Sequence, residues 1–299
     1  MVDMTPTPSV APSTPAPVPA DAVITVRSLV KRYGDFTAVD GLDLEIHHGE
    51  IFALLGPNGA GKTTTVEILE GYRDATTGDV RVLGQDPATA GIDWRSRVGI
   101  VLQSTGAFDQ LTVAEVVHHF AGYYPDPNDP DTVIAQVGLT EKRDVRTTKL
   151  SGGQRRRLDV ALAIIGRPEL VFLDEPTTGF DPEARRQFWG LIRDLRGLGT
   201  TIVLTTHYLD EAEALADRVG VIVGGRLIEV GTPETIGGRA QAQARVTYLG
   251  EHGTEVALTD SPTATVAELM TRFGGEVPEL TVTRPSLEDV YLQMIGASQ

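Results

Sequence analysis

Short runs made almost entirely of apolar residues alternate with helical patterns along most of the chain. Such runs predict buried strands at residues 51–55, 98–102, 170–173 and 201–204, with further strands at 219–223 and 227–230. The spacing of apolar residues elsewhere predicts helices at residues 66–69, 111–124, 131–137, 155–165, 188–195 and 209–216. Strands buried on both faces belong to a parallel sheet that is covered by helices. We therefore predict an α/β core.

The two ends of this core have different patterns. Before it, apolar residues predict strands at residues 23–26, 36–39 and 42–46, and residues 71–84 predict a turn-rich hairpin. After it, the pattern predicts a hairpin at 246–249 and 256–258, helices at 264–273 and 287–295, and a strand at 280–282. We expect a disordered tail rich in Pro, Thr, Ser and Ala at 1–21, a main domain at 22–237 with a helical insert at about 104–150, and an α+β accessory domain at 238–299.

Composition and charge argue against several classes of protein. The 299 residues carry a net charge of −15, which argues against non-specific nucleic-acid binding and against a polybasic membrane anchor. The sequence contains no cysteine, so disulfides and cysteine-based metal sites are absent. No apolar run approaches the roughly 20 residues that span a bilayer, and the first residues lack the apolar centre of a secretory signal.

A glycine-rich loop between the first apolar run and the first helix points to phosphate binding. Its backbone can curl so that successive N–H groups face phosphate oxygens, and the helix adds its positive N-terminal end. In this P-loop pattern, Lys62 reaches the β- and γ-phosphates of a nucleotide and the hydroxyl of Thr63 holds Mg²⁺. The expected nucleotide-binding residues are Gly56, Pro57, Asn58, Gly59, Ala60, Gly61, Lys62, Thr63 and Thr64.

Polar residues follow three of the predicted buried strands: Gln103, the pair Asp174 and Glu175, and His207. Open α/β sheets bind ligands at the carboxyl ends of their strands. We expect Asp174 to hold Mg²⁺ and Glu175 to orient or deprotonate an attacking water, while His207 contacts the terminal phosphate. Gln103 is compatible both with a contact to the metal and with a solvent-exposed strand end, which is the commoner environment of glutamine.

Two further features have both a functional and a purely structural interpretation. Ser151, Gly152, Gly153 and Gln154 open a predicted helix, where serine and glycine at the N-terminus can bind an anion. The arginines at 155–157 are interpreted as a solvated, ion-paired face rather than as a phosphate clamp. Tyr33 precedes the P-loop, and its ring is compatible with stacking on a nucleotide base and with closing a surface hairpin.

Five elements in this order resemble one family, the nucleotide-binding subunits of ATP-binding cassette (ABC) transporters. They are GPNGAGKTT, Gln103, LSGGQ, LVFLDEP and His207, and the resemblance covers residue 23 to the C-terminus. LSGGQ ahead of the LVFLDEP strand is the most specific part, because a P-loop alone occurs in many NTPases. The resemblance implies a P-loop NTPase with a RecA-like parallel sheet, an N-terminal antiparallel β subdomain, a helical insert and a small α+β C-terminal domain.

The resemblance also implies a role for each matching residue. Tyr33 resembles the aromatic residue that stacks on adenine, and Gln103 resembles the glutamine that senses Mg²⁺ and the membrane partner. Glu175 resembles the catalytic base and His207 the switch histidine. Asp181 resembles an aspartate that crosses a dimer interface. Phe180 departs from the family, in which leucine is usual at this position.

The resemblance further implies partners. Two subunits of this family sandwich ATP, so residues 151–154 would face the ATP on Lys62 of a second copy, and the pair would drive a separate membrane permease at the cytoplasmic face. No nucleic acid is expected. The sequences at 69–84, 174–182 and 284–296 are similar to bacterial drug-resistance exporters of the daunorubicin type. The alternatives are the ATPase of a polysaccharide or lipid exporter or of an importer, and a soluble mechanochemical ATPase.

Overall fold

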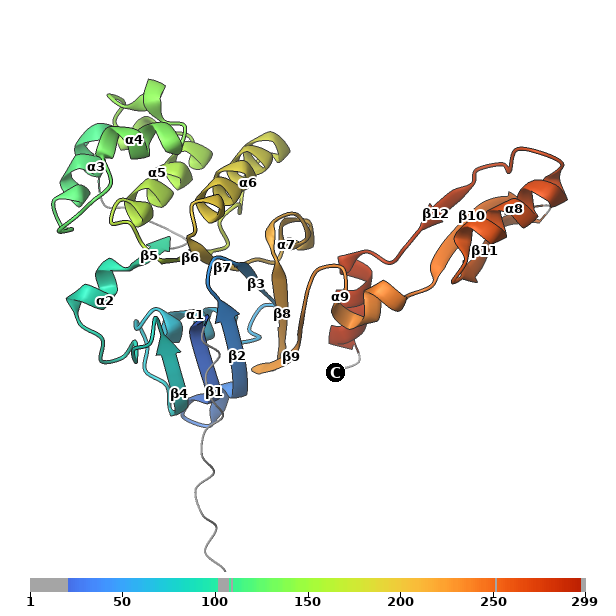
Figure 1. Ribbon diagram of the computed structural model, residues 1–299, viewed down its shortest axis with the longest axis horizontal. Helices are drawn as coiled ribbons and strands as arrows, with labels where there is room; N and C mark the ends of the chain where they lie inside the picture. The colour runs from blue at the N-terminus through green and yellow to red at the C-terminus, as the bar shows by residue number, and fades with distance from the viewer. Residues whose placement is uncertain (1–20, 102–107, 109, 251, 297–299) are drawn as a thin grey trace, which may run out of the picture.

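The computed structural model describes residues 21–101, 108, 110–250 and 252–296 (Figure 1). Residues 1–20 of the predicted tail and Gln103 therefore lie outside the described residues. The strands form three sheets, and the helices gather mainly around the central one. Among the described residues, none of the helices has both the length and the hydrophobicity needed to cross a lipid bilayer.

A six-stranded sheet forms the centre of the molecule. Its order is β5-β6-β7-β3-β8-β9, and all neighbouring strands are parallel except β8 and β9. Alternate residues of β3 explain its wholly apolar run, because Ala53 and Leu55 enter one hydrophobic core whereas Phe52 and Leu54 enter the other. The strands are β3 Ile51–Leu55, β5 Val98–Val101, β6 Leu170–Asp174, β7 Thr201–Thr205, β8 Arg218–Val223 and β9 Arg226–Gly231.

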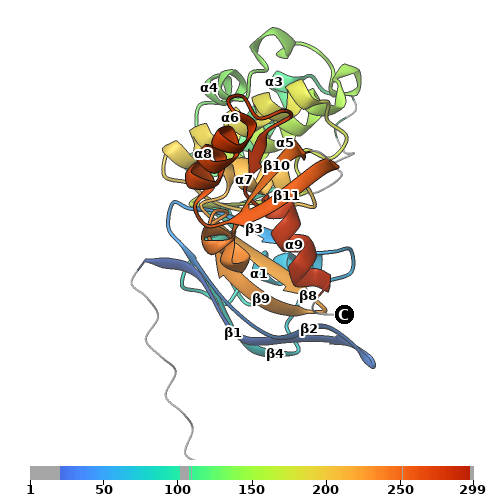
Figure 2. The same ribbon diagram turned by 90° about the vertical axis from the view of Figure 1, so that its right-hand side faces the viewer.

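A three-stranded antiparallel sheet packs beside the central one (Figure 2). Its strands are β1 Ala22–Tyr33, β2 Phe36–His47 and β4 Thr77–Val82, in the order β2-β1-β4. The predicted hairpin at 71–84 is wrong, because β4 pairs with the distant β1, for example Val82 with Ile24. The side chains of Val80 and Val82 are buried in the core that this sheet shares with α1 (Lys62–Leu69). Burial of these two valines favours the pairing of β4 with β1.

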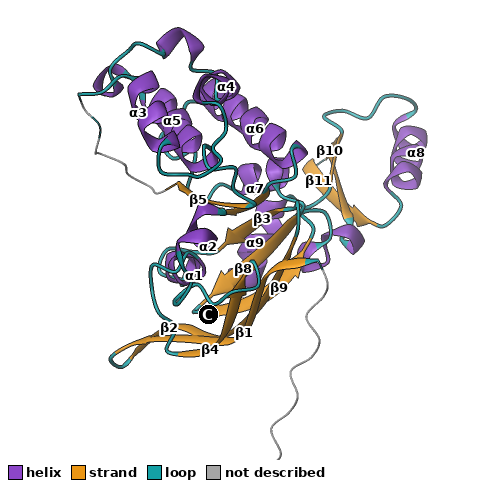
Figure 3. Cartoon of the chain, turned by 60° about the vertical axis from the view of Figure 1, so that its left-hand side comes forward, coloured by secondary structure: helices purple, strands orange, loops and turns teal. Residues whose placement is uncertain are grey.

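Helices α3 to α6 gather at one end of the central sheet, whereas α1 and α2 lie apart from this group, nearer to the antiparallel sheet (Figure 3). Thr112 and Glu115 form a reciprocal capping box at the start of α3, and the Asp129 side chain caps α4. The helices are α1 Lys62–Leu69, α2 Ile92–Ser96, α3 Val113–Ala121, α4 Pro130–Gln136, α5 Gly152–Ile164, α6 Pro182–Gly197 and α7 Leu209–Leu215, with short 3₁₀ turns η1 Thr140–Lys142 and η2 Thr147–Lys149.

The C-terminal region forms a small sheet and two helices. Its elements are η3 Ile236–Gln241, β10 Ala244–Gly250, β11 Gly253–Thr259, α8 Pro262–Phe273, β12 Thr281–Thr283 and α9 Leu287–Gly296. β10 lies between β11 and β12, and α8 covers one face of this sheet through Leu269. By contrast, Leu287, Tyr291 and Met294 of α9 pack against the larger core of the central sheet. The last helix of the expected accessory domain thus returns to the main domain.

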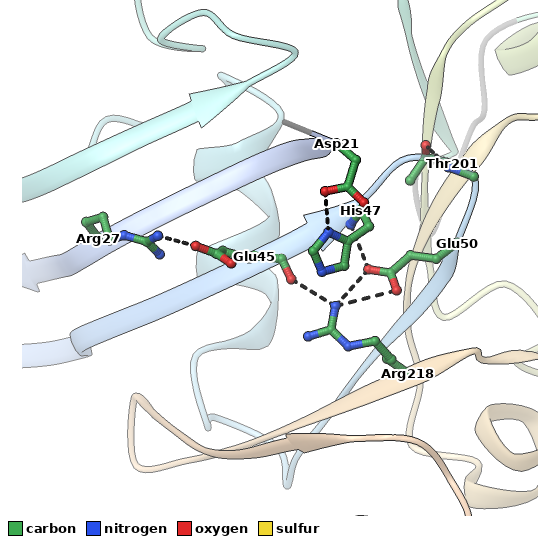
Figure 4. A network of polar contacts seen from close by, with 8 residues as sticks. Asp21, Arg27, Glu45, His47, Glu50, Thr201 and Arg218 are labelled. Atoms are coloured by element: carbon green, nitrogen blue, oxygen red, sulfur yellow. Dashed lines mark hydrogen bonds and ion pairs between the residues drawn. The ribbon is translucent and has the colours of Figure 1, made fainter. Parts of the chain in front are cut away.

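A polar network joins the antiparallel sheet to the amino-terminal edge of the central sheet (Figure 4). Arg218 of β8 donates to a carboxylate oxygen of Glu50 at 3.1 Å and to the carbonyl of Glu45 at 3.2 Å. The N–H of Gly49 donates to the Thr201 hydroxyl at 3.0 Å. These contacts lie at the start of β3 and β7, opposite to the carboxyl edge where the predicted phosphate loop begins.

Candidate functional site

The loop between β3 and α1 has a backbone that only glycine can supply at two positions. A Cβ on Gly56 would lie 2.3 Å from the carbonyl oxygen of Ile222, so a side chain has no room there. Gly61 has a φ of 104°, and its Cβ would lie 2.4 Å from the carbonyl oxygen of Ala38. The loop therefore lies close against its neighbours, directly before the positive N-terminus of α1.

Lys62 is the first residue of α1, directly after this loop, and it is only 7% exposed. Its ammonium group donates to the carbonyl of Gly56 at 2.7 Å and to that of Pro57 at 3.2 Å. Burial lowers the pKa of Lys62, and the charges of Glu175 and Asp174 oppose this shift. A phosphate anion placed between the loop and these carboxylates would offer the ammonium group a stronger acceptor than the loop carbonyls.

A pocket in front of the loop contains Tyr33 together with most of the predicted phosphate-binding residues. Its lining residues are Tyr33, Phe36, Ala38, Asn58, Gly59, Gly61, Lys62, Thr63, Thr64 and Glu175. Tyr33 is 41% exposed, so part of its ring can contact a ligand. The Lys31 ammonium and the Arg73 guanidinium lie 5.1 and 5.4 Å from the ring centroid. The sequence prediction omitted Phe36, although an exposed aromatic three residues after Tyr33 was a usable signal.

The carboxylates that follow β6 are held by a hydroxyl of the neighbouring strand. The Thr205 hydroxyl donates to Asp174 Oδ1, while the N–H of Glu175 donates to the Thr205 carbonyl at 3.1 Å. Glu175 has a φ of 43°, a left-handed conformation that is uncommon for a residue with a side chain. Such strain clusters at functional sites. Thr205 is not among the site residues predicted from the sequence.

His207 and Glu175 face one another across the ends of β6 and β7. The distance from His207 Nδ1 to Glu175 Oε1 is 3.3 Å, and the Thr178 hydroxyl donates to Glu175 Oε2 at 3.3 Å. The His207 ring also packs on Tyr208, with 4.0 Å between ring centroids. The structure thus brings together the glutamate and the histidine that the sequence placed on separate strands.

The remaining predicted residues lie outside this pocket. Ser151 caps α5 and forms a capping box with Gln154, whose N–H donates to the serine hydroxyl at 3.2 Å. Ser151 is exposed, as is Gly152 after it. Asp181 caps α6 by accepting from the N–H groups of Glu183 and Ala184. None of these residues lines the pocket that contains Lys62.

One of the three arginines after LSGGQ departs from its expected environment. Arg156 is buried, and its guanidinium donates to the backbone carbonyls of Asp174 and Pro176. The expectation of a solvated face is therefore wrong for this residue, while Arg155 is exposed as expected. A sequence signal existed, because Arg156 shares a helix face with Val160 and Ile164, which are apolar and buried.

Comparison with known proteins gives a consistent family. The pattern described as ABC transporter matches residues 39–178. The daunorubicin resistance ATP-binding protein DrrA3 of Streptomyces coeruleorubidus is 37% identical, and the alignment covers 93% of this chain and 97% of that protein. The Nod factor export ATP-binding protein I of Cupriavidus pinatubonensis is 34% identical, with 96% of this chain and 95% of that protein covered.

Solved structures agree with these sequence comparisons. The structure of cbiO1 from Clostridium perfringens, part of the ABC transporter complex cbiONQ, has a TM-score of 0.65 at 28% identity and covers 72% of this chain and 90% of that one. An ATP-binding subunit of an ABC transporter has the same fold, with a TM-score of 0.67 at 20% identity over 91% of this chain and 99% of that one. The predicted P-loop NTPase fold is confirmed. The chain belongs to the ATP-binding cassette transporter family, as an ATP-binding and ATP-hydrolysing subunit.

Proposed function

We propose that this subunit drives the export of a drug-like or antibiotic molecule through a separate membrane permease. The proposal depends on one observation. The chain is 35–37% identical to daunorubicin resistance ATP-binding proteins, and each alignment covers at least 91% of the chain. Export of a lipid-like molecule is the second candidate. It is supported by the similarly complete match to the Nod factor export protein. It is also supported by 43% identity over 217 residues, 70% of this chain but 10% of that protein, to the human phospholipid-transporting ATPase ABCA7.

ATP is proposed to bind in the pocket in front of the P-loop. The adenine would stack on the exposed part of the Tyr33 ring, which adds favourable contact without needing a particular hydrogen-bond pattern. The backbone N–H groups of residues 58–64 and the N-terminus of α1 would hold the phosphates. Lys62 would exchange its two loop carbonyls for phosphate oxygens, which explains how a buried ammonium group becomes fully compensated.

Mg²⁺ is the metal that fits the residues at this site. The carboxylate of Asp174 and the hydroxyl of Thr63 are hard oxygen donors of the kind that Mg²⁺ prefers, and Thr63 lines the pocket. Gln103 is proposed as a further oxygen donor from the sequence alone. When bound, Mg²⁺ would neutralise part of the charge on the phosphate oxygens. Thr205 would keep Asp174 oriented through its hydroxyl hydrogen bond.

Glu175 is proposed to orient and deprotonate the water that attacks the γ-phosphate. Its carboxylate is fixed from two sides, by His207 at one oxygen and by Thr178 at the other. His207 would hold the Glu175 side chain in place and contact the γ-phosphate. Catalysis of this kind consists mostly of positioning and electrostatic stabilisation, so the geometry of the residues around Glu175 decides the rate.

A second copy of the chain is proposed to complete the site. Residues 151–154 are outside the pocket of their own chain, and Ser151 and Gly152 are exposed. They would cover the ATP bound to Lys62 of the other copy, and Asp181 would lie near the same interface. The dimer would dock onto the permease at the cytoplasmic face of the membrane through its helical insert, at about residues 104–150. We propose no nucleic-acid partner.

The test uses Glu175→Gln, which keeps the shape of the side chain but removes its basicity. We expect its ATP turnover to fall by about 10²–10⁴-fold while ATP binding persists and a closed dimer accumulates. Glu268→Gln, at an exposed position of α8, is the matched control and should keep normal turnover. Wild-type turnover in Glu175→Gln would refute its assigned role.

Transport is tested by trapping Glu175→Gln with ATP in cells and purifying it from mildly solubilised membranes. We expect a polytopic membrane protein to accompany it. Expressing both wild-type chains in a sensitive bacterium should then lower the accumulation of a fluorescent anthracycline, and Lys62→Ala should abolish this effect. Recovery only with soluble partners or nucleic acid would contradict the transport assignment. A permease that changes lipid exposure but not anthracycline accumulation would favour the second candidate.

A further inference from the structure

Arg156 is a buried cation directly behind the turn that carries Glu175. It is 7% exposed and lies in α5, which packs over the end of the central sheet that contains β5 and β6 (Figure 1). Its Nε donates to the carbonyl of Pro176 at 3.2 Å, and its Nη2 donates to the carbonyl of Asp174. These two carbonyls flank Glu175 on either side. One guanidinium therefore fixes the backbone both before and after the proposed general base.

The turn needs such support because Glu175 has a strained backbone. Its φ of 43° is disfavoured for a residue with a Cβ and persists only where neighbouring groups impose it. On the β7 side, the carbonyl and hydroxyl of Thr205 accept from the N–H of Glu175. On the α5 side, Arg156 holds the two flanking carbonyls. The direction of the Glu175 side chain follows from both restraints together.

The charge of Arg156 also suits this position. Asp159, Asp174 and Glu211 are the acidic groups that act on its guanidinium. Transferring a cation from water to a buried position is unfavourable unless such charges and hydrogen bonds compensate for it. A lysine would keep the charge but could not match the planar fork that reaches two carbonyls at once. The geometry thus requires arginine, rather than any basic residue, at position 156.

The same helix carries the residues that are proposed to contact the second nucleotide. α5 begins at Gly152 with Ser151 as its cap, so Arg156 follows Gln154 by two residues and Ser151 by five, which is about one and a half helical turns at most. Because residues 151–154 and Arg156 belong to the start of one helix, a displacement of this part of α5 would also move the guanidinium that binds the carbonyls on either side of Glu175.

We propose that Arg156 is a positioning residue that orients Glu175 and couples it, within one chain, to the LSGGQ residues that face the other ATP. This inference rests on the proposed roles of Glu175 and of residues 151–154. It predicts that the loss of Arg156 slows hydrolysis without weakening the binding of ATP, because no atom of Arg156 belongs to the lining of the nucleotide pocket.

The test compares Arg156→Met and Arg156→Lys in the full-length chain, with Arg155→Gln as the control from the exposed side of the same helix. We measure kcat, KM, the Hill coefficient for ATP, and the Kd of a fluorescent ATP analogue. We expect kcat to fall at least about tenfold in both Arg156 variants, with Kd changed less than about twofold and the Hill coefficient reduced towards one. Arg155→Gln should match the wild type.

A double mutant separates positioning from a general loss of structure. If Arg156 acts through Glu175, then Arg156→Lys should cause no further loss of single-turnover rate in the Glu175→Gln background. Equal loss in both backgrounds, or a kcat of Arg156→Lys within twofold of the wild type, would overturn the inference. If Arg156→Met does not fold, the Arg156→Lys results decide. Retained turnover in Glu175→Gln itself would instead refute the proposed function on which the inference rests.

Discussion

Glu70 is a buried carboxyl group at the end of α1, and its protonation controls part of the stability of the protein. The residue is 9% exposed. Burial raises the pKa of Glu70 to about 8 from an ordinary value of 4.5, and the negative charges of Asp174 and Glu67 add to this shift. The group therefore stays largely protonated in the folded chain at neutral pH, whereas in the unfolded chain it ionises.

The sign of the effect on stability follows from this difference. Below pH 4.5 the carboxyl group of Glu70 is protonated in both the folded and the unfolded chain, so it does not change the free energy of unfolding. Between pH 4.5 and 8 the unfolded chain loses the proton and the folded chain keeps it, so the free energy of unfolding falls as the pH rises. Each pH unit in this window lowers the free energy of unfolding by about 1.4 kcal/mol, so at pH 7 it is lower by about 3 kcal/mol. Above pH 8 the loss reaches a plateau.

Glu70→Gln removes the titrating group while keeping the size of the side chain. We expect the variant to be more stable than the wild type by about 1 kcal/mol at pH 5 and by about 3 kcal/mol at pH 7. Urea unfolding of the nucleotide-free, Mg²⁺-free protein at pH 5, 6, 7 and 8 measures this difference. Glu141→Gln, at an exposed position in η1, is the control and should change the stability by less than about 0.5 kcal/mol. A difference for Glu70→Gln that is independent of pH would refute the reasoning.

Three further substitutions test separate parts of the site. In calorimetry, Tyr33→Ala should raise the Kd for ATP about tenfold because stacking is lost, whereas Tyr33→Trp should bind ATP normally. An ATP affinity of Tyr33→Ala equal to that of the wild type would contradict the stacking role. Gly61→Ala places a Cβ 2.4 Å from the Ala38 carbonyl oxygen, at a residue whose φ is 104°. Titration with a fluorescent nucleotide should therefore show that ATP binding is lost, and retained affinity would show that the loop tolerates the change. Glu211→Ala removes the acceptor of the buried Thr177 hydroxyl and of the Trp189 indole N–H. The free energy of unfolding, measured in urea, should fall by about 2–4 kcal/mol. An unchanged value would mean that water replaces the carboxylate.

Much of the fold followed from the sequence because the strongest patterns have a local physical cause. A strand such as β3 sends alternate residues into two cores, so it must be apolar at every position, and this makes it recognisable without any knowledge of its neighbours. The P-loop was recognisable because positions such as Gly61 tolerate no side chain. In the structure, Tyr33, residues 58–59 and 61–64 of the P-loop and Glu175 contribute to the lining of one pocket.

The sequence failed where the deciding partner is distant in the chain. Residues 71–84 contain turn residues and two valines, a pattern that fits a local hairpin, but β4 pairs with β1 about 50 residues earlier. The burial of Arg156 had a local signal in its spacing from Val160 and Ile164, but the partners of its guanidinium did not. These partners, the carbonyls of Asp174 and Pro176, lie 18 and 20 residues later in the chain.

The turn after β6 receives contacts from α5, from the end of β7 and from α7. Arg156 of α5 binds its carbonyls, Thr205 at the end of β7 binds Asp174 and the N–H of Glu175, and His207 contacts the Glu175 carboxylate. Glu211 of α7 accepts a hydrogen bond from Thr177 in the same turn. These contacts lie apart from the P-loop glycines, which shape the phosphate site by steric exclusion instead. ATP affinity and hydrolysis rate should therefore be separable by mutation, because substitutions in the P-loop change Kd whereas substitutions around this turn change kcat.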